Sequence, residues 1–217
     1  MSHITLIRHG QANSGAKDEI SYDKLSALGH EQAGWLGAHL RETDNFHSRL
    51  YTGTLTRHIE TAQGMAMGLE PVRDARLNEL EYFTMATLLE EQHEIPFPTE
   101  QAAFTTHLPT VFDYWRAGKI EGTPETWEQF HTRVDDALNE IAADPGPALV
   151  VTSGGLIAMA MAQAMQLDIP AQARLALAIM HTSMHRLFPI AGHLSPVLFN
   201  AVPHLDNTDR RHAQTHI

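Results

Sequence analysis

The sequence predicts an α/β protein, a three-layer sandwich in which helices flank a mostly parallel central sheet. Short apolar runs bounded by turn residues alternate with longer segments whose apolar residues recur every three or four positions. The first pattern is typical of buried strands and the second of amphipathic helices, and their alternation favours a parallel sheet. The length of 217 residues suits one domain, since single α/β domains commonly reach about 200–250 residues.

The chain is predicted to begin with a buried strand at residues 3–7, which Arg8-His9-Gly10 ends. A polar loop then runs from Gln11 to about Leu25. The first long helix is predicted from its cap residue, Ser26, to about Arg41, because apolar residues share one of its faces and a serine hydroxyl can accept from a free N–H group of the first turn.

Three more elements are predicted before the middle of the chain. Residues 49–52 read as a second strand, and residues 54–69 as a helix with apolar residues at helical spacing. Arg57 lies off that apolar stripe, near the start of the helix. A short extended segment is predicted over residues 72–80.

Residues 83–126 are predicted to form an insertion or lid rather than part of the core, because four prolines interrupt short helical pieces there. Regular helical spacing returns over residues 127–142. Residues 148–151 form a four-residue apolar run between turn signals, which favours a buried strand. Residues 156–165 then predict another helix.

The last predicted strand covers residues 178–188. We expect residues 1–205 to form one domain that includes the insertion, and residues 206–217 to form a polar, frayed C-terminal tail. No internal repeat or low-complexity tract interrupts this arrangement.

Composition excludes several classes of function. With no cysteine, the chain has no disulfide framework, thiolate metal site or cysteine nucleophile. Fifteen basic against 26 acidic residues give a net charge of −11, which argues against a nucleic-acid partner. The longest apolar run, residues 154–165, is shorter than the roughly 18 residues of a membrane span. The start of the chain shows no secretion signal, so we predict a cytoplasmic protein without a membrane partner.

The fifteen histidines are an unusual number for this length. We expect most of them on the solvated surface, with imidazole chemistry at one or two. No His-Glu-x-x-His run or Cys/His cluster supports a metal site, and nothing in the sequence implies a cofactor.

Three polar, glycine-containing segments follow predicted strands: Arg8-His9-Gly10, Thr52-Gly53-Thr54 and Thr152-Ser153-Gly154-Gly155. Ligands of open α/β sheets bind beyond the carboxyl ends of the strands. Arginine binds phosphate through two parallel hydrogen bonds, and a Ser-Gly-Gly turn that opens a helix directs backbone N–H groups at an anion. Arg8, Arg57 and this turn therefore predict an anion pocket, with His9 beside it as a candidate nucleophile.

The segment Leu6-Ile7-Arg8-His9-Gly10 resembles the signature of the histidine phosphatase superfamily, the phosphoglycerate-mutase-like proteins. Further segments resemble this family in the same order, so that the resemblance covers roughly residues 4 to 205. These segments are Leu25-Ser26-Ala27-Leu28-Gly29 with Gln32-Ala33, Thr54-Leu55-Thr56-Arg57 with Glu60-Thr61-Ala62, Arg76-Leu77-Asn78-Glu79, Trp127-Glu128-Gln129-Phe130 with Arg133-Val134, and Phe199-Asn200 with His204-Leu205.

The resemblance implies a role for each matching residue. His9 would attack phosphorus and become a phosphohistidine, and Arg8 and Arg57 would neutralise the phosphoryl oxygens. Glu79 would protonate the leaving alcohol and later activate water. Glu81 is the rival acid, because two residues along a strand return to the same face, although Glu79 matches the family motif directly.

The chain departs from the family at Ser153, where most members have a second histidine that contacts the phosphoryl group. A serine hydroxyl and the N–H of Gly154 can still donate hydrogen bonds, but serine carries no positive charge. Losing a charged contact in an enclosed site costs on the order of 2–4 kcal/mol of transition-state stabilisation. The sequence is similar in its Thr-Ser-Gly-Gly turn to a bacterial branch of the family, and His181 or His185 are candidates to fill the space.

The leading hypothesis is a metal-independent phosphomonoester hydrolase that acts on a small phosphorylated substrate, a phosphoprotein included. A second hypothesis is a catalytically weak or silent protein that binds a phosphorylated ligand, because of Ser153. A third is a phosphoglycerate mutase. We expect residues 11–24 and 83–126 to form the walls that select the substrate, whose identity, like the oligomeric state, stays open.

Overall fold

The computed structural model describes residues 2–13, 15–16, 18–43 and 45–216. Six strands form one sheet in the order β3-β2-β4-β1-β5-β6. The strands are β1 (Ile4–Arg8), β2 (Arg49–Thr52), β3 (Pro71–Arg73), β4 (Ala148–Thr152), β5 (Met184–Ile190) and β6 (His193–Ala201). Strands β3, β2, β4 and β1 pair in parallel, whereas β5 runs antiparallel to both of its neighbours. The sheet is therefore mostly parallel, as predicted.

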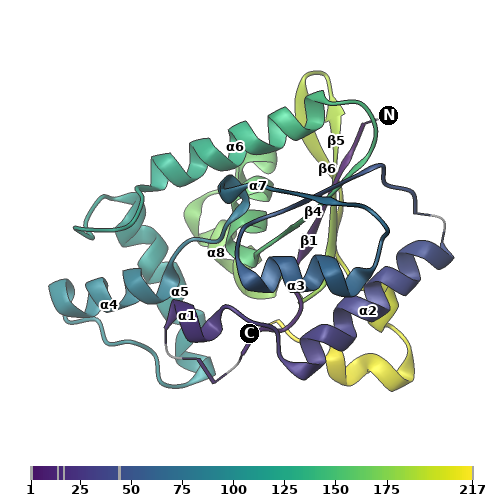
Figure 1. The fold of residues 1–217 in the computed structure, drawn as a ribbon. Helices are drawn as coiled ribbons and strands as arrows, with labels where there is room; N and C mark the ends of the chain where they lie inside the picture. The colour runs from purple at the N-terminus through teal and green to yellow at the C-terminus, as the bar shows by residue number, and fades with distance from the viewer. Residues whose placement is uncertain (1, 14, 17, 44, 217) are drawn as a thin grey trace.

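Helices cover both faces of the sheet (Figure 1). On one face lie α2 (Ala27–Glu42) and α3 (Thr56–Met65), and the other carries α6 (Trp127–Ala143), α7 (Gly154–Met165) and α8 (Ile169–Ala178). Successive side chains of β4 point to opposite faces of the sheet and so enter different cores. Leu149 and Val151 belong to the hydrophobic cluster under α2 and α3, whereas Ala148 and Val150 belong to the larger cluster on the opposite face. The three-layer α/β sandwich is confirmed.

N-cap residues in the sequence account for the first residues of two helices, α2 and α6. Ser26 caps α2, where its Oγ accepts the Gly29 N–H at 3.1 Å. Thr126 caps α6 in the same way, and the Gln129 side chain returns a bond to the Thr126 N–H. Both helices begin within one residue of the predicted position, because the cap residues satisfy N–H groups that would otherwise have no partner.

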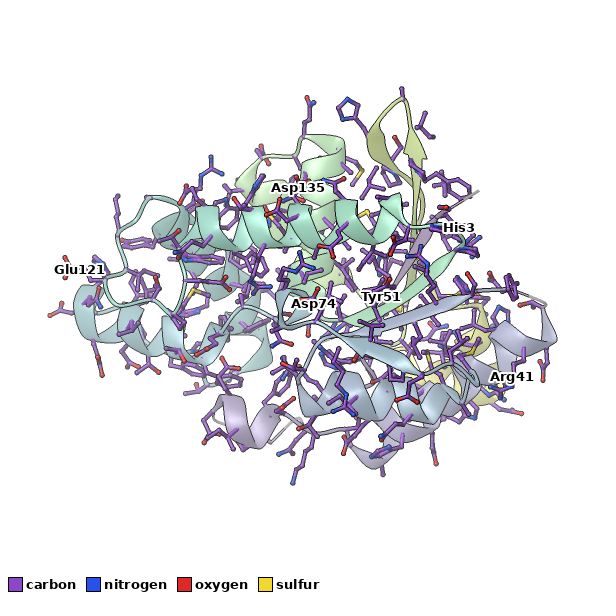
Figure 2. The ribbon with its side chains drawn as sticks, turned by 45° about the horizontal axis from the view of Figure 1, so that its top comes forward. His3, Arg41, Tyr51, Asp74, Glu121 and Asp135 are labelled. Carbon is purple, nitrogen blue, oxygen red and sulfur yellow. The ribbon has the colours of Figure 1, made fainter. Side chains whose placement is uncertain are left out.

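The segment at 83–126 is more regular than its prolines indicated. It holds most of α4 (Tyr82–His93) and all of α5 (Gln101–Arg116), and α5 continues through Pro109. Val111, Phe112 and Trp115 join the main hydrophobic cluster, so the expectation of a segment outside the core is wrong. A proline removes a helical hydrogen bond, and the burial of these large side chains offsets that loss. Glu121, just beyond α5, lies at the opposite end of the molecule from His3 (Figure 2).

The predicted strand at 178–188 is correct only in its second half. Helix α8 extends to Ala178, Thr182 has a left-handed backbone (φ 56°), and β5 starts at Met184. The sequence did contain the signal for α8, because Asp168 accepts the Ala171 N–H at 2.8 Å as an N-cap. Strand β6 was also missed. The segment predicted as extended at 72–80 is shorter, since a 3₁₀ turn at Ala75–Leu77 follows β3.

The described part of the C-terminal tail, residues 206–216, is ordered rather than frayed. Thr208–Ala213 forms a 3₁₀ helix, and the Gln32 Nε2 group of α2 donates to the Ala213 carbonyl at 2.7 Å. The Thr215 carbonyl accepts the His181 N–H at 2.8 Å. A polar composition therefore does not prevent docking here, because backbone carbonyls of the tail supply the acceptors.

Seven of the fifteen histidines are buried and only five are exposed, so the expectation that most lie on the solvated surface is wrong. They are His9, His47, His58, His107, His181, His185 and His204. Across the described ranges, no helix has the length and apolar character needed to cross a bilayer.

Candidate active site

The three predicted segments meet at the carboxyl edge of the sheet. Strands β1, β2 and β4 end there side by side, at Arg8, Thr52 and Thr152. A cavity of about 500 Å³ opens over this edge. Arg8, His9, Arg57, Glu79 and Gly154 all line it. The structure therefore brings these predicted site residues together, as the strand-end argument required.

His9 lies on the floor of the cavity with a fixed ring. Its Nδ1 lies 2.7 Å from the carbonyl oxygen of Gly10, and because a carbonyl can only accept, Nδ1 carries the ring proton and leaves a lone pair on Nε2. The loop is held in turn by the Gly10 N–H, which donates to Thr61 Oγ1 of α3 at 3.0 Å. Burial, with Arg57 and Arg8 nearby, holds the pKa of His9 well below its ordinary value, which keeps the imidazole neutral near pH 7.

Arg57 is positioned by the loop that precedes α2. Asp23 Oδ1 accepts from Arg57 Nη1 at 3.0 Å, and the same carboxylate accepts the backbone N–H groups of Thr56 and Arg57 at the start of α3. The guanidinium carbon lies 5.0 Å from the centre of the Tyr22 ring. Asp23 thus serves as a helix cap supplied from outside the helix, and it fixes the arginine at the same time.

Arg8 is tied to two distant backbone carbonyls. Its Nη1 donates to Ile179 and, at 2.6 Å, to His216. The Nε groups of Arg8 and Arg57 are both buried without a hydrogen-bond partner among the described residues. Unpaired donors on buried cations are unfavourable.

Glu79 and Glu81 have different surroundings. Glu79 Oε2 accepts the Gly155 N–H at the start of α7, at 2.9 Å, and this carboxylate lines the cavity. A Cβ on Gly155 would lie 2.5 Å from Glu79 Oε1, so the absence of a side chain at Gly155 is what admits the carboxylate. Glu81 is exposed and accepts from the Thr84 hydroxyl at 3.0 Å. The geometry favours Glu79 over its rival.

Ser153 does not face open space. Its Oγ lies 2.6 Å from His58 Nε2, and both side chains are fully buried. His58 reaches this position from α3 across Gly53, where a Cβ would lie 2.2 Å from His58 Nδ1. Burial and the neighbouring Arg57 hold the pKa of His58 well below its ordinary value. A histidine from a different element thus lies against Ser153, the position where the sequence resemblance implied a second histidine in most of the family.

Of the two histidines proposed from the sequence to fill that space, His181 lies beside His9 without a bond to Ser153, and His185 lies farther along β5. The His181 ring centre is 5.9 Å from that of His9, and its Nδ1 is held by Thr215 of the tail. His185 bonds to Ser183 and the Asn200 N–H within the β5–β6 region. His58, 5.7 Å from His9, was missed, although it follows Arg57 directly in the sequence. In the part of the chain that is described, no group of three or more His, Asp or Glu side chains is arranged to hold a metal ion.

Comparison with known proteins places the chain in a family. The model of the histidine phosphatase superfamily (branch 1) matches residues 4–201. A 2,3-bisphosphoglycerate-dependent phosphoglycerate mutase from Tropheryma whipplei (strain Twist) is 33% identical over 126 residues, which are 51% of this chain and 56% of that protein. The chain thus spans little more than half the length of that relative.

Two further similarities extend over most of the chain. The probable phosphoglycerate mutase GpmB of Klebsiella pneumoniae subsp. pneumoniae is 29% identical over 192 residues, covering 86% of this chain and 85% of that protein. The structure of a phosphoserine phosphatase mutant from Entamoeba histolytica, in complex with phosphoserine, shares the fold with a TM-score of 0.69 at 17% identity, covering 94% of this chain and 100% of that chain. The family match runs from the first strand to the last, and on that ground the chain belongs to the histidine phosphatase superfamily (branch 1).

Proposed function

We propose that this protein is a metal-independent phosphomonoesterase that acts through a phosphohistidine at His9. The observation that carries the proposal is the fixed tautomer of His9, whose Nδ1 donates to the Gly10 carbonyl. Its free Nε2 lone pair lies on the floor of a cavity that Arg8, Arg57 and Glu79 also line. A neutral imidazole between two guanidinium groups is suited to attack a phosphoryl group.

In the first step, His9 Nε2 attacks phosphorus and the bond from phosphorus to the leaving oxygen breaks. Arg8 and Arg57 balance the negative charge on the phosphoryl oxygens, which is the largest requirement of phosphoryl transfer. Glu79, in its protonated form, gives its proton to the leaving oxygen, since an alkoxide leaves poorly. The products are the free alcohol, a phosphohistidine and a Glu79 carboxylate.

In the second step, water attacks the phosphohistidine. The Glu79 carboxylate takes a proton from the water as its oxygen bonds to phosphorus, and the nitrogen–phosphorus bond breaks. Inorganic phosphate is released, and His9 and Glu79 return to their starting protonation states. The sequence assigned Ser153 one hydrogen bond to the phosphoryl group, but its side chain is fully buried and does not line the cavity. Gly154 does line it, at the start of α7, where its N–H group would donate to the phosphoryl group instead.

Ser153 is able to donate because of how His58 is protonated. His58 Nδ1 has no hydrogen-bond partner among the described residues, so the ring proton is better placed on Nε2, where Ser153 Oγ accepts it. The serine hydroxyl then keeps its own proton for another acceptor.

The names of the relatives favour a second candidate function, phosphoglycerate mutase. Conversion of 3-phosphoglycerate to 2-phosphoglycerate, measured with and without the bisphosphate, distinguishes it from hydrolysis. A place in the cytoplasm stays a prediction from the sequence.

The proposal is tested by hydrolysis of 4-nitrophenyl phosphate in EDTA. Wild-type protein should release phosphate, and His9→Ala should reduce kcat by at least 1,000-fold because the nucleophile is lost. Glu79→Gln should reduce kcat by about 100-fold, since general acid catalysis contributes about 10²–10⁴-fold. Glu81→Gln is the matched control, and we expect it to keep wild-type activity.

Full activity of His9→Ala in a clean preparation would refute the phosphohistidine mechanism. Equal losses in the Glu79 and Glu81 variants would refute the assignment of the acid. Tight phosphate binding without any turnover in the wild type would favour a phospholigand-binding protein instead.

A further inference from the structure

The outer part of the cavity differs in character from its floor. The floor holds Arg8, His9 and Arg57, whereas the wall beyond it is formed largely by apolar and aromatic side chains. These are Leu80, Tyr82, Phe83, Phe97, Pro98, Phe104, Leu108, Phe112, Ala176 and Leu177. Most of them come from α4, α5 and the connection between these helices. Apart from the phosphate, a bound substrate would therefore contact mainly hydrocarbon.

The aromatic wall is held in place by its own contacts. The Phe83 and Phe97 rings stack with centres 5.8 Å apart, and Tyr82 packs edge-on against Phe104 with centres 5.0 Å apart. The Tyr82 hydroxyl is engaged by His107 Nδ1 at 2.8 Å. The four rings are half-buried, and a wall fixed in this way needs little reordering when a flat or chain-like apolar group binds.

The described lining of the outer cavity contains acidic side chains. Beyond Arg8 and Arg57, the described lining residues include no lysine or arginine, whereas Glu19, Glu79 and Glu100 all line the cavity. The Glu19 carboxylate accepts the Phe83 N–H at 2.9 Å, which holds it beside the aromatic wall. Burial, opposed by the Phe83 N–H and by Arg57, raises the pKa of Glu19 to about 7, and Glu79 and Glu81 add to the rise. Glu19 is then only partly ionised near pH 7, and Glu79 is neutral when it acts as the acid. A second anionic group on a substrate would lose its hydration there and find no further lysine or arginine among the described lining residues.

From this division we infer the substrate class: a monoester that carries one phosphate on an uncharged, mainly apolar alcohol or phenol. The inference rests on the proposed phosphate site at Arg8, His9 and Arg57. It sets this chain apart from relatives named for phosphoglycerate, a substrate that carries a carboxylate. It also assigns a purpose to the aromatic part of the segment at 83–126.

The test compares affinities by calorimetry in the His9→Ala protein, so that turnover does not interfere. The ligands are inorganic phosphate, hexyl phosphate and 6-(phosphonooxy)hexanoate, the last two differing only by a terminal carboxylate. Hexyl phosphate should bind at least tenfold more tightly than the carboxylate compound and more tightly than inorganic phosphate. Phe97→Ala should lower the affinity for hexyl phosphate at least threefold and leave the affinity for inorganic phosphate unchanged.

The acidic side chains are tested by the double substitution Glu19→Gln with Glu100→Gln. In this double variant, the ratio between the affinities for hexyl phosphate and for the carboxylate compound should fall at least threefold. Glu91→Gln, an exposed position on α4 away from the cavity, is the control and should leave the difference unchanged.

The outcomes separate the two proposals. If inorganic phosphate binds but the hexyl chain adds no affinity, or if the carboxylate compound binds as tightly as hexyl phosphate, the substrate class is wrong and the phosphate site stands. If no phosphate compound binds, both are wrong. Failure of wild-type hydrolysis, together with the expected order of affinities, would overturn the proposed activity alone.

Discussion

Ser153 and His58 together occupy the volume at the end of β4. Their contact at 2.6 Å, with both side chains fully buried, leaves no room for a larger side chain at 153. The histidine that the sequence resemblance implied for this position therefore cannot simply be put in place of Ser153. Protein interiors are close-packed, and inserting a ring against another ring forces shifts that cost about 1–3 kcal/mol.

We predict that Ser153→His alone lowers the melting temperature and does not raise activity. The double variant Ser153→His with His58→Ala should recover stability and exceed wild-type kcat for 4-nitrophenyl phosphate by about tenfold, because an imidazole then stands at the phosphoryl site without a clash. Thermal melts and kinetics of the two single variants and the double variant form a complete cycle. Additive effects of the two substitutions on both quantities would show that the side chains do not share this volume.

The C-terminal tail acts as a positioning element for Arg8. Residues 215 and 216 supply carbonyl groups to His181 and Arg8, while the preceding 3₁₀ helix docks on Gln32. A hydrogen bond to a charged group contributes about 1.5–3 kcal/mol. The arginine that binds phosphate in our proposal therefore depends on an element at the other end of the chain.

Removing residues 215–217 should lower kcat/KM by about 10- to 100-fold, the equivalent of one charge-assisted hydrogen bond. Far-ultraviolet circular dichroism should be unchanged, because the sheet and its helices lie outside the deletion. Arg211→Ala, an exposed substitution in the same tail, is the control. Unchanged kcat/KM after the deletion would mean that the Ile179 carbonyl alone is enough to hold Arg8.

Helix caps and the periodicity of apolar residues predicted those helices and strands whose position depends on neighbouring residues in the sequence. Ser26 gave the start of α2, and the apolar run at 148–151 gave β4, because caps and periodicity are properties of neighbouring residues. The dependence of Arg8 on Ile179 and His216 could not be predicted, since a bond from a side chain to a backbone carbonyl leaves no mark on the sequence at the acceptor. The placement of His58 against Ser153 was equally hidden, because it depends on how α3 packs beside β4.

In the site itself, the strand-end argument and the family resemblance nominated Arg8, His9, Arg57 and Glu79, and the structure gathers these residues around one cavity. Their catalytic roles stay predictions. The prolines of the segment at 83–126 were misleading, because the burial of large side chains on α5 outweighs one lost helical hydrogen bond.

The whole molecule depends on histidines that are neutral in its interior. Burial is the main cause that lowers the pKa of His47 to about 4, and those of His185 and His204 to about 3. Unfolded histidines bind protons near pH 6.5, whereas these folded ones do not. The free energy of unfolding is therefore unaffected by these histidines above pH 6.5. It decreases as the pH falls from 6.5 toward the pKa values of the folded state, by up to about 1.4 kcal/mol per pH unit for each histidine.

We predict that the melting temperature falls by about 10 °C or more between pH 7 and pH 5. His204→Gln should flatten this dependence, because the glutamine amide can replace the bond from His204 Nε2 to Thr182 without titrating. His212→Gln, at an exposed position, should leave the slope as in the wild type. Identical slopes for all three proteins would contradict the assignment of the interior histidines as the titrating groups.

The bond from Arg8 to the His216 carbonyl joins positions 208 residues apart. A chain is made from its N-terminus, so the strand that bears Arg8 leaves the ribosome long before either of the carbonyls that hold its guanidinium. Contacts of such long sequence separation also form late in folding. A nascent chain would thus carry His9 while the neighbouring Arg8 was still unanchored, and the order of translation itself would delay the completion of the site until nearly all of these residues had been made.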